Sequence, residues 1–171
     1  IRGAPLIAIV ACLGLAVDLQ NDVSTKELQA IETMNTMERS ANAIYAYIQG
    51  KMDYVAKSRP TAVNLFNALQ EVKEALLKAK DDDDSSDPPS VRMVNAVVQH
   101  AEFMLQRDEA DCRAIGKNGA DAIILDDDAT PITIMTICNT GSLATAAYVT
   151  ALGVVRAVHQ AGKLAKVIAL E

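Results

Sequence analysis

The periodicity of the apolar residues changes once along the chain, and this change limits the folds that the chain can form. Residues 131–137, Pro-Ile-Thr-Ile-Met-Thr-Ile, are a short β-branched run typical of a buried strand. A turn at 138–142 follows, then an Ala- and Val-rich stretch with helical spacing over 143–160, a capping Gly162 and a second predicted strand at 167–170. This order predicts one βαβ unit with parallel strands.

The chain before residue 125 has helical spacing instead. Residues 5–20 are almost continuously apolar and predict a largely buried helix, with Pro5 suited to its first turn. Ser24 and Glu27 have capping-box spacing, and they open one long amphipathic helix that is predicted to end between Gly50 and Val55.

The later helices are separated by a charged, Pro-containing segment. Pro60 begins the next predicted helix, and the sequence DDDDSSDPP at 81–89 then predicts an exposed loop. Two further helical stretches are predicted at 91–106 and 108–117, the second ending at Asn118-Gly119.

These patterns together predict an α/β fold that is mostly helical. We expect a helical N-terminal domain over residues 1–128 and the beginning of a Rossmann-like domain over 129–171. A single βαβ unit leaves the faces and edges of its parallel strands uncovered. The chain is therefore expected to be an internal fragment of a longer protein, and inactive by itself.

Composition and charge exclude several classes of function. The net charge of −6 argues against a general nucleic-acid binder, which needs a surplus of Lys and Arg on one face. The longest uncharged apolar run, 3–17, is shorter than the roughly 20 residues of a membrane span. Three Cys form no CxxC pair and, with two His, no zinc quartet. We expect a cytoplasmic protein without disulfide, metal, nucleic-acid or membrane partners.

Cys138 is the strongest candidate for a catalytic residue in this sequence. It lies where the first predicted strand ends and the predicted helix is about to begin, which is where open α/β sheets bind ligands. Amides at a helix N-terminus would favour its thiolate form. Free cysteines are also common as buried structural residues, so position alone leaves both interpretations open.

Three segments resemble successive motifs of the methylthioribose-1-phosphate isomerases. They are IRGAPLIAIVACLGLA at 1–16, SRPTAVNLF at 58–66 and CNTGSLATAAYVTALGVVRA at 138–157. The resemblance implies an aldose–ketose isomerase of methionine salvage that needs no cofactor and acts on a sugar phosphate as a cytoplasmic homodimer. It also implies that Cys138 assists catalysis, that Arg2, Gly3 and Ala4 bind the substrate phosphate, and that Arg59 lies in the substrate pocket.

The chain departs from the pattern of this family in two ways. Many relatives have His before the turn Cys, where this chain has Ile137. The Asp that serves the family as proton donor is expected further along the polypeptide, after Glu171. Two related functions remain open as alternatives: ribose-1,5-bisphosphate isomerase, and the non-catalytic regulatory subunits of translation initiation factor 2B.

Overall fold

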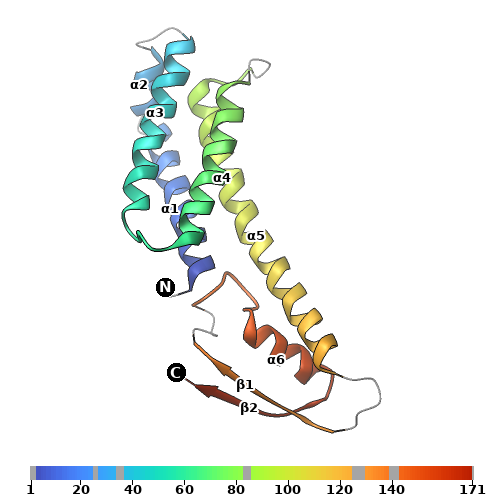
Figure 1. Cartoon of the computed structure of the whole chain (residues 1–171). Helices are drawn as coiled ribbons and strands as arrows, with labels where there is room; N and C mark the ends of the chain where they lie inside the picture. The colour runs from blue at the N-terminus through green and yellow to red at the C-terminus, as the bar shows by residue number, and fades with distance from the viewer. Residues whose placement is uncertain are drawn as a thin grey trace. The chain divides into compact units, whose positions relative to one another are not determined.

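A computed structural model describes residues 3–24, 27–33, 37–82, 86–124, 130–138 and 143–170. Six helices and two strands lie within these residues (Figure 1). They are α1 (Ala4–Ser24), α2 (Glu27–Thr33), α3 (Met37–Ala56), α4 (Val63–Lys80), α5 (Pro89–Ile123), β1 (Ile132–Ile137), α6 (Ala151–Gln160) and β2 (Leu164–Leu170). The predicted α/β fold class, mostly helical with a small parallel sheet, is confirmed.

The chain forms two compact units. One contains Ile7–Met104, and the other combines Ile1–Leu6 with Leu105–Glu171. These units are defined by packing, and the domain boundary expected near residue 128 stays a prediction.

The 7–104 unit is a helical bundle with an apolar core. The first helix presents Ile9, Cys12 and Leu19 to this core, at 2% exposure or less. The stretch Ala4–Asp22 is long and apolar enough to cross a membrane, but a helix in the core of a folded domain can have the same length and composition. One face of α1 is buried in the core, but Val10 and Val17 are 41% and 58% exposed, so the helix that the sequence predicted to be largely buried is buried on one side only. Other fully buried side chains of the unit are Leu28, Ile44, Ile48, Leu65, Val72, Leu76, Met93 and Val97.

The single long helix predicted from Ser24 to beyond Gly50 is wrong. The structure has two helices, α2 and α3, which pack against each other. The Ser40 hydroxyl donates to the Glu32 carbonyl at 3.2 Å, although eight residues of one helix would span about 12 Å. Two shorter helices that pack against each other have the same apolar periodicity as one long helix, so the periodicity alone could not distinguish these arrangements.

The loop predicted at 81–89 is shorter than expected. Asp81, Asp82 and residues 86–88 are exposed and not helical, whereas Pro89 and Ser90 are in the first turn of α5, where Ser90 is buried. The Ser90 N–H donates to the Glu32 carboxylate at 2.7 Å, which places a negative charge at the N-terminus of α5.

The fifth helix runs without a break through the predicted stop at Asn118-Gly119. The reason is close packing on α6 rather than a cap. A Cβ on Gly119 would lie 2.6 Å from the Val154 side chain, and one on Gly116 would lie 3.0 Å from the Gly153 carbonyl carbon. Both glycines allow α6 to approach α5 closely, and neither of them ends α5.

The two strands pair in parallel, as predicted, with Ile134 opposite Val167 and Ile137 opposite Leu170. They lie in the second unit, where α6 connects them and packs against both (Figure 1). The chain covers one face of this sheet, so alternate residues of β1 are exposed, Met135 at 63% and Ile137 at 64%. The expected capping of α6 by Gly162, at φ 70°, is confirmed.

We predict opposite stability changes for the same substitution at two helical glycines. Alanine normally stabilises a helix interior by about 0.5–1 kcal/mol relative to glycine. Gly50→Ala should show this gain, because nothing lies within 4 Å of the place that its Cβ would take. Gly116→Ala should instead lower the free energy of unfolding by about 1–3 kcal/mol, because its Cβ meets the backbone of Gly153. Urea denaturation measures both, and equal shifts would contradict the packing role of Gly116.

Candidate active site

Cys138 follows the last residue of β1 directly and is exposed. Its φ of 82° lies in the left-handed region, which is uncommon for a non-glycine residue and turns the chain sharply out of the strand. Residues 139–142 lie outside the described part of the chain. The thiol is therefore presented at the carboxyl end of a parallel strand, as its sequence position predicted.

The helix expected at Leu143 does not begin there. The connecting segment, which we define as residues 143–150, is irregular, and α6 begins only at Ala151. Tyr148 and Val149 have φ values of 60° and 58°, which a right-handed helix cannot contain. The predicted helix over 143–160 is thus wrong in its first half. An effect of helix N-terminal amides on the Cys138 thiol loses its support.

Gly3 contacts the connecting segment. The Gly3 N–H donates to the Leu143 carbonyl at 3.4 Å, and the Leu6 N–H donates to the Ala144 carbonyl at 3.2 Å. A Cβ on Gly3 would lie 2.1 Å from the Ala144 Cα, so only glycine fits. The start of the 1–16 motif therefore meets residues 143 and 144 of the 138–157 motif within one unit. Ala4 is exposed at the start of α1 beside this contact, and Arg2 lies outside the described residues.

Arg59 belongs to the other unit, in the turn between α3 and α4, and its side chain is exposed. Its carbonyl accepts the Ala62 N–H at 3.0 Å. The residue before it, Ser58, lines a cavity of about 720 Å³ between α1 and α3. The same cavity is bordered by Tyr54 and Lys51.

The structure also contains polar contacts to the connecting segment that the sequence did not indicate. Asp108 of α5 accepts the Ala146 N–H at 2.7 Å. The guanidinium groups of Arg113 and Arg156 lie 4.7 and 5.6 Å from the centre of the Tyr148 ring. Helical spacing places Asp108 and Arg113 on an ordinary helix surface, so no sequence signal could have indicated these contacts.

The other two thiols have a different character from Cys138. Burial, with a smaller contribution from the Glu71 charge, raises the pKa of Cys12 to about 11. Burial and then the Asp108 charge also raise the pKa of Cys112. Both thiols are buried, so they are far less reactive than an exposed thiol. Among the described residues, no group of three or more His, Cys, Asp or Glu could hold a metal ion.

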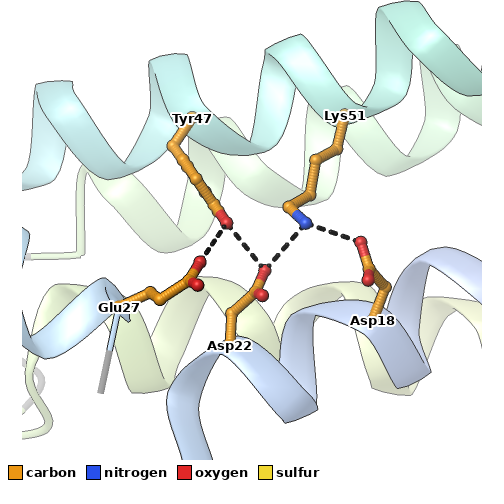
Figure 2. Close-up of polar contacts among 5 residues, drawn as sticks. All are labelled: Asp18, Asp22, Glu27, Tyr47 and Lys51. Carbon is orange, nitrogen blue, oxygen red and sulfur yellow. Dashed lines mark hydrogen bonds and ion pairs between the residues drawn. The ribbon is translucent and has the colours of Figure 1, made fainter. Parts of the chain in front are cut away.

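A second polar network, in the 7–104 unit, joins three helices (Figure 2). The Lys51 ammonium lies 2.6 Å from Asp18 and 3.0 Å from Asp22. Tyr47 donates to Asp22 and Glu27 at 3.0 and 3.1 Å. Burial lowers the pKa of Lys51, but its bonds to Asp18 and Asp22 outweigh burial and raise it overall. Lys51 therefore stays charged and holds α1 to α3, a role that no motif in the sequence indicated.

Comparison with known proteins shows the family of this chain. A model of the Initiation factor 2 subunit family matches residues 1–171, the whole chain. The chain belongs to this family. The expected resemblance is confirmed, because relatives named methylthioribose-1-phosphate isomerase match this chain along its full sequence.

Three similar proteins illustrate the match. Methylthioribose-1-phosphate isomerase of Uncinocarpus reesii is 43% identical over 176 residues, and that of Populus trichocarpa is 42% identical over 172. Each alignment covers 100% of this chain and 42% of the relative, so the chain spans less than half of their length. The crystal structure of translation initiation factor eIF-2B subunit delta from A. fulgidus aligns with a TM-score of 0.63 and 28% identity, over 99% of this chain and 42% of that one.

Proposed function

We propose that this chain belongs to a methylthioribose-1-phosphate isomerase, which converts 5-methylthioribose 1-phosphate to 5-methylthioribulose 1-phosphate. The name shared by relatives at 39–44% identity supports the reaction. The observation that carries the proposal is the contact of Gly3 with the connecting segment. It joins the segment expected to bind phosphate to residues 143–150 of the 138–157 motif, whose first residue is the exposed Cys138.

The reaction has a specific chemical difficulty that these residues could meet. The anomeric oxygen carries the phosphate, so the sugar cannot open its ring as a free aldose does. An acid must assist ring opening, and hydrogen must then move between C2 and C1, through an enediol or as a hydride shift. We assign Cys138 to the reacting carbons as acid, base or transition-state stabiliser. Arg2, Gly3 and Ala4 would hold the phosphate through guanidinium and backbone N–H donors. Neither route needs a cofactor.

A binding function is the second candidate. It is favoured by the eIF-2B subunit delta structure, whose fold this chain shares. The test is an assay of the intact protein with 5-methylthioribose 1-phosphate and, separately, ribose 1,5-bisphosphate. We expect turnover of the first compound. Turnover of only the second would change the substrate, and no turnover of either would favour the binding function.

Arg59→Ala should act mainly on substrate binding. Loss of a charge-assisted hydrogen bond costs about 1.5–3 kcal/mol, so KM should rise about tenfold or more while kcat changes little. Arg59→Lys should recover only part of this loss, because an ammonium lacks the two-pronged geometry of a guanidinium. Exposed Arg39 of α3 offers a matched control as Arg39→Ala. An unchanged KM for Arg59→Ala would remove Arg59 from the pocket.

We further propose a cytoplasmic homodimer that acts in methionine salvage and methionine biosynthesis. Three free thiols, one of them exposed, suit a reducing compartment. The apolar side chains exposed on the sheet, including Met135 and Ile137, suit coverage by further polypeptide. Light scattering of the intact protein tests the dimer.

A further inference from the structure

The connecting segment holds the start of α1, which we define as residues 3–6. The Gly3 N–H donates to the Leu143 carbonyl at 3.4 Å, and the Leu6 N–H donates to the Ala144 carbonyl at 3.2 Å. Amides at the beginning of a helix have no partner within the helix, so acceptors outside it fix their position. Ala4 lies between these two bonded residues. The direction of its own N–H therefore follows from the position of the connecting segment.

The connecting segment depends on other elements for its conformation. It is neither helix nor strand, so it lacks a regular ladder of backbone hydrogen bonds. Its internal bonds include those from the Val149 N–H to the Ala147 carbonyl, at 2.7 Å, and from the Thr145 hydroxyl to the same carbonyl, at 3.2 Å. The left-handed φ of Val149 is rare for a β-branched residue and persists only where the surroundings impose it.

The fifth helix supplies the contacts next to Ala144. The Asp108 carboxylate accepts the Ala146 N–H at 2.7 Å, in a partly buried position. A bond to a charged acceptor is shorter and stronger than one between neutral groups. Thr145 is only 2% exposed, and its side chain hydrogen-bonds the Cys112 thiol, one helical turn after Asp108. One face of α5 thus holds the two residues that follow Ala144.

Tyr148 attaches the other end of the connecting segment independently of Asp108. Its ring packs so closely against Gly116 and Gly153 that a Cβ on these glycines would lie 2.9 and 3.2 Å from it. Arg113 and Arg156 lie near the ring, and Arg156 also donates to the Tyr148 carbonyl at 3.0 Å. Loss of the Asp108 carboxylate should therefore release residues 143–146 and leave α6 in place.

We propose that Asp108 is a positioning residue for phosphate binding, because it holds the connecting segment where the Leu143 and Ala144 carbonyls fix the start of α1. The proposal rests on the proposed isomerase function, in which residues 2–4 bind the substrate phosphate. The path from the Asp108 carboxylate to Gly3 and Leu6 passes only through residues 144–146, and all of these residues belong to one unit. Asp108 acts through the backbone rather than on the substrate.

The experiment compares Asp108→Ala with Asp108→Asn in the intact protein. Alanine removes the acceptor of the Ala146 N–H, whereas asparagine keeps an oxygen acceptor and loses the charge. Asp121→Ala is the matched control on the same helix, because Asp121 is exposed and pairs with Lys117. Two measurements are made: the exchange rate of the Leu6 amide hydrogen, by mass spectrometry with residue-level fragmentation, and kcat and KM with 5-methylthioribose 1-phosphate.

In Asp108→Ala the Leu6 amide hydrogen should exchange at least about tenfold faster, because the carbonyl that accepts it is no longer held. KM should rise about 5–20-fold and kcat should change less than about twofold, since the phosphate does not react and is bound alike in the ground and transition states. Asp108→Asn should lie between Asp108→Ala and wild type. The amides of α6 should exchange as in wild type. A merely structural role would speed exchange in α6 as well and leave KM unchanged.

Several results would overturn the proposal: a wild-type exchange rate of the Leu6 amide in Asp108→Ala, an unchanged KM, equal effects of Asp121→Ala, or an Asp108→Asn protein no closer to wild type than Asp108→Ala. If Asp108→Ala does not fold, as judged by circular dichroism, Thr145→Val is tested by the same criteria, with Thr145→Ser as the variant that keeps the hydroxyl.

The exchange measurement separates this proposal from the proposed function. A protein that turns over neither sugar phosphate disproves the isomerase assignment. The exchange rate of the Leu6 amide still decides in that case whether Asp108 holds the start of α1, because this rate is measured without substrate.

Discussion

Cys138→Ser in the intact protein is expected to lower kcat for 5-methylthioribose 1-phosphate by about 10²–10⁴-fold, the usual contribution of a positioned acid or base. A serine hydroxyl keeps the size of the side chain but is a far weaker acid than a thiol. Because the side chain is exposed, the free energy of unfolding should change by less than about 0.5 kcal/mol. KM should stay close to wild type, since the thiol acts in the transition state.

The matched control for this variant is Ile137→Val, one residue earlier. Ile137 loses only a methylene, so kcat should be unchanged, and the free energy of unfolding should fall by no more than about 0.5–1.5 kcal/mol, the usual cost of Ile→Val where further polypeptide covers the side chain. Steady-state kinetics and urea denaturation measure these quantities. A kcat within about threefold of wild type for Cys138→Ser would remove the thiol from the reaction.

Gly3→Ala is expected to have the second large effect, on stability and turnover together. The new Cβ would lie 2.1 Å from the Ala144 Cα and 2.3 Å from its carbonyl oxygen, and neither backbone atom can rotate away. The N-terminal end of α1 must then separate from the connecting segment, with loss of the Gly3 bond to Leu143. We expect the free energy of unfolding to fall by about 1–3 kcal/mol or more. Turnover should fall with it, because the segment proposed to bind the substrate phosphate, which contains Gly3, is displaced.

The control for Gly3→Ala is Gly14→Ala in the same helix. Nothing lies within 4 Å of a Cβ at Gly14, so this variant should be neutral or more stable by about 0.5–1 kcal/mol. Urea denaturation and the isomerase assay measure both variants. Equal stability of the two proteins would contradict the close contact between Gly3 and Ala144.

Much of the fold could be predicted from the sequence because its signals are local. The β-branched run at 132–137, the glycine at 162 and the apolar run after Pro5 predicted β1, the end of α6 and α1. The parallel pairing of β1 and β2 followed from the order of elements, since a strand, a helix and a strand close in one favoured way. The position of Cys138 after β1 followed from the same order.

Three elements could not be predicted, and the reason differs for each. Whether the sequence after Ser24 forms one helix or the two helices α2 and α3 depends on packing, because both arrangements have the same apolar periodicity. The passage of α5 through Gly119 depends on the neighbouring Val154, which is distant in sequence. The irregular connecting segment contains good helix formers, but tertiary contacts to Tyr148 and Ala146 override their propensity.

The order and type of most elements, the family resemblance and the place of Cys138 at the carboxyl end of a strand follow from local signals, because periodicity, turn residues and motifs are properties of adjacent residues. The contacts of Gly3 with Ala144, of Asp108 with Ala146 and of Tyr148 with two arginines are visible only once the chain has folded. These contacts join residues up to 141 positions apart, from Gly3 to Ala144. Distances of this kind depend on how helices pack, and local sequence patterns carry no information about them.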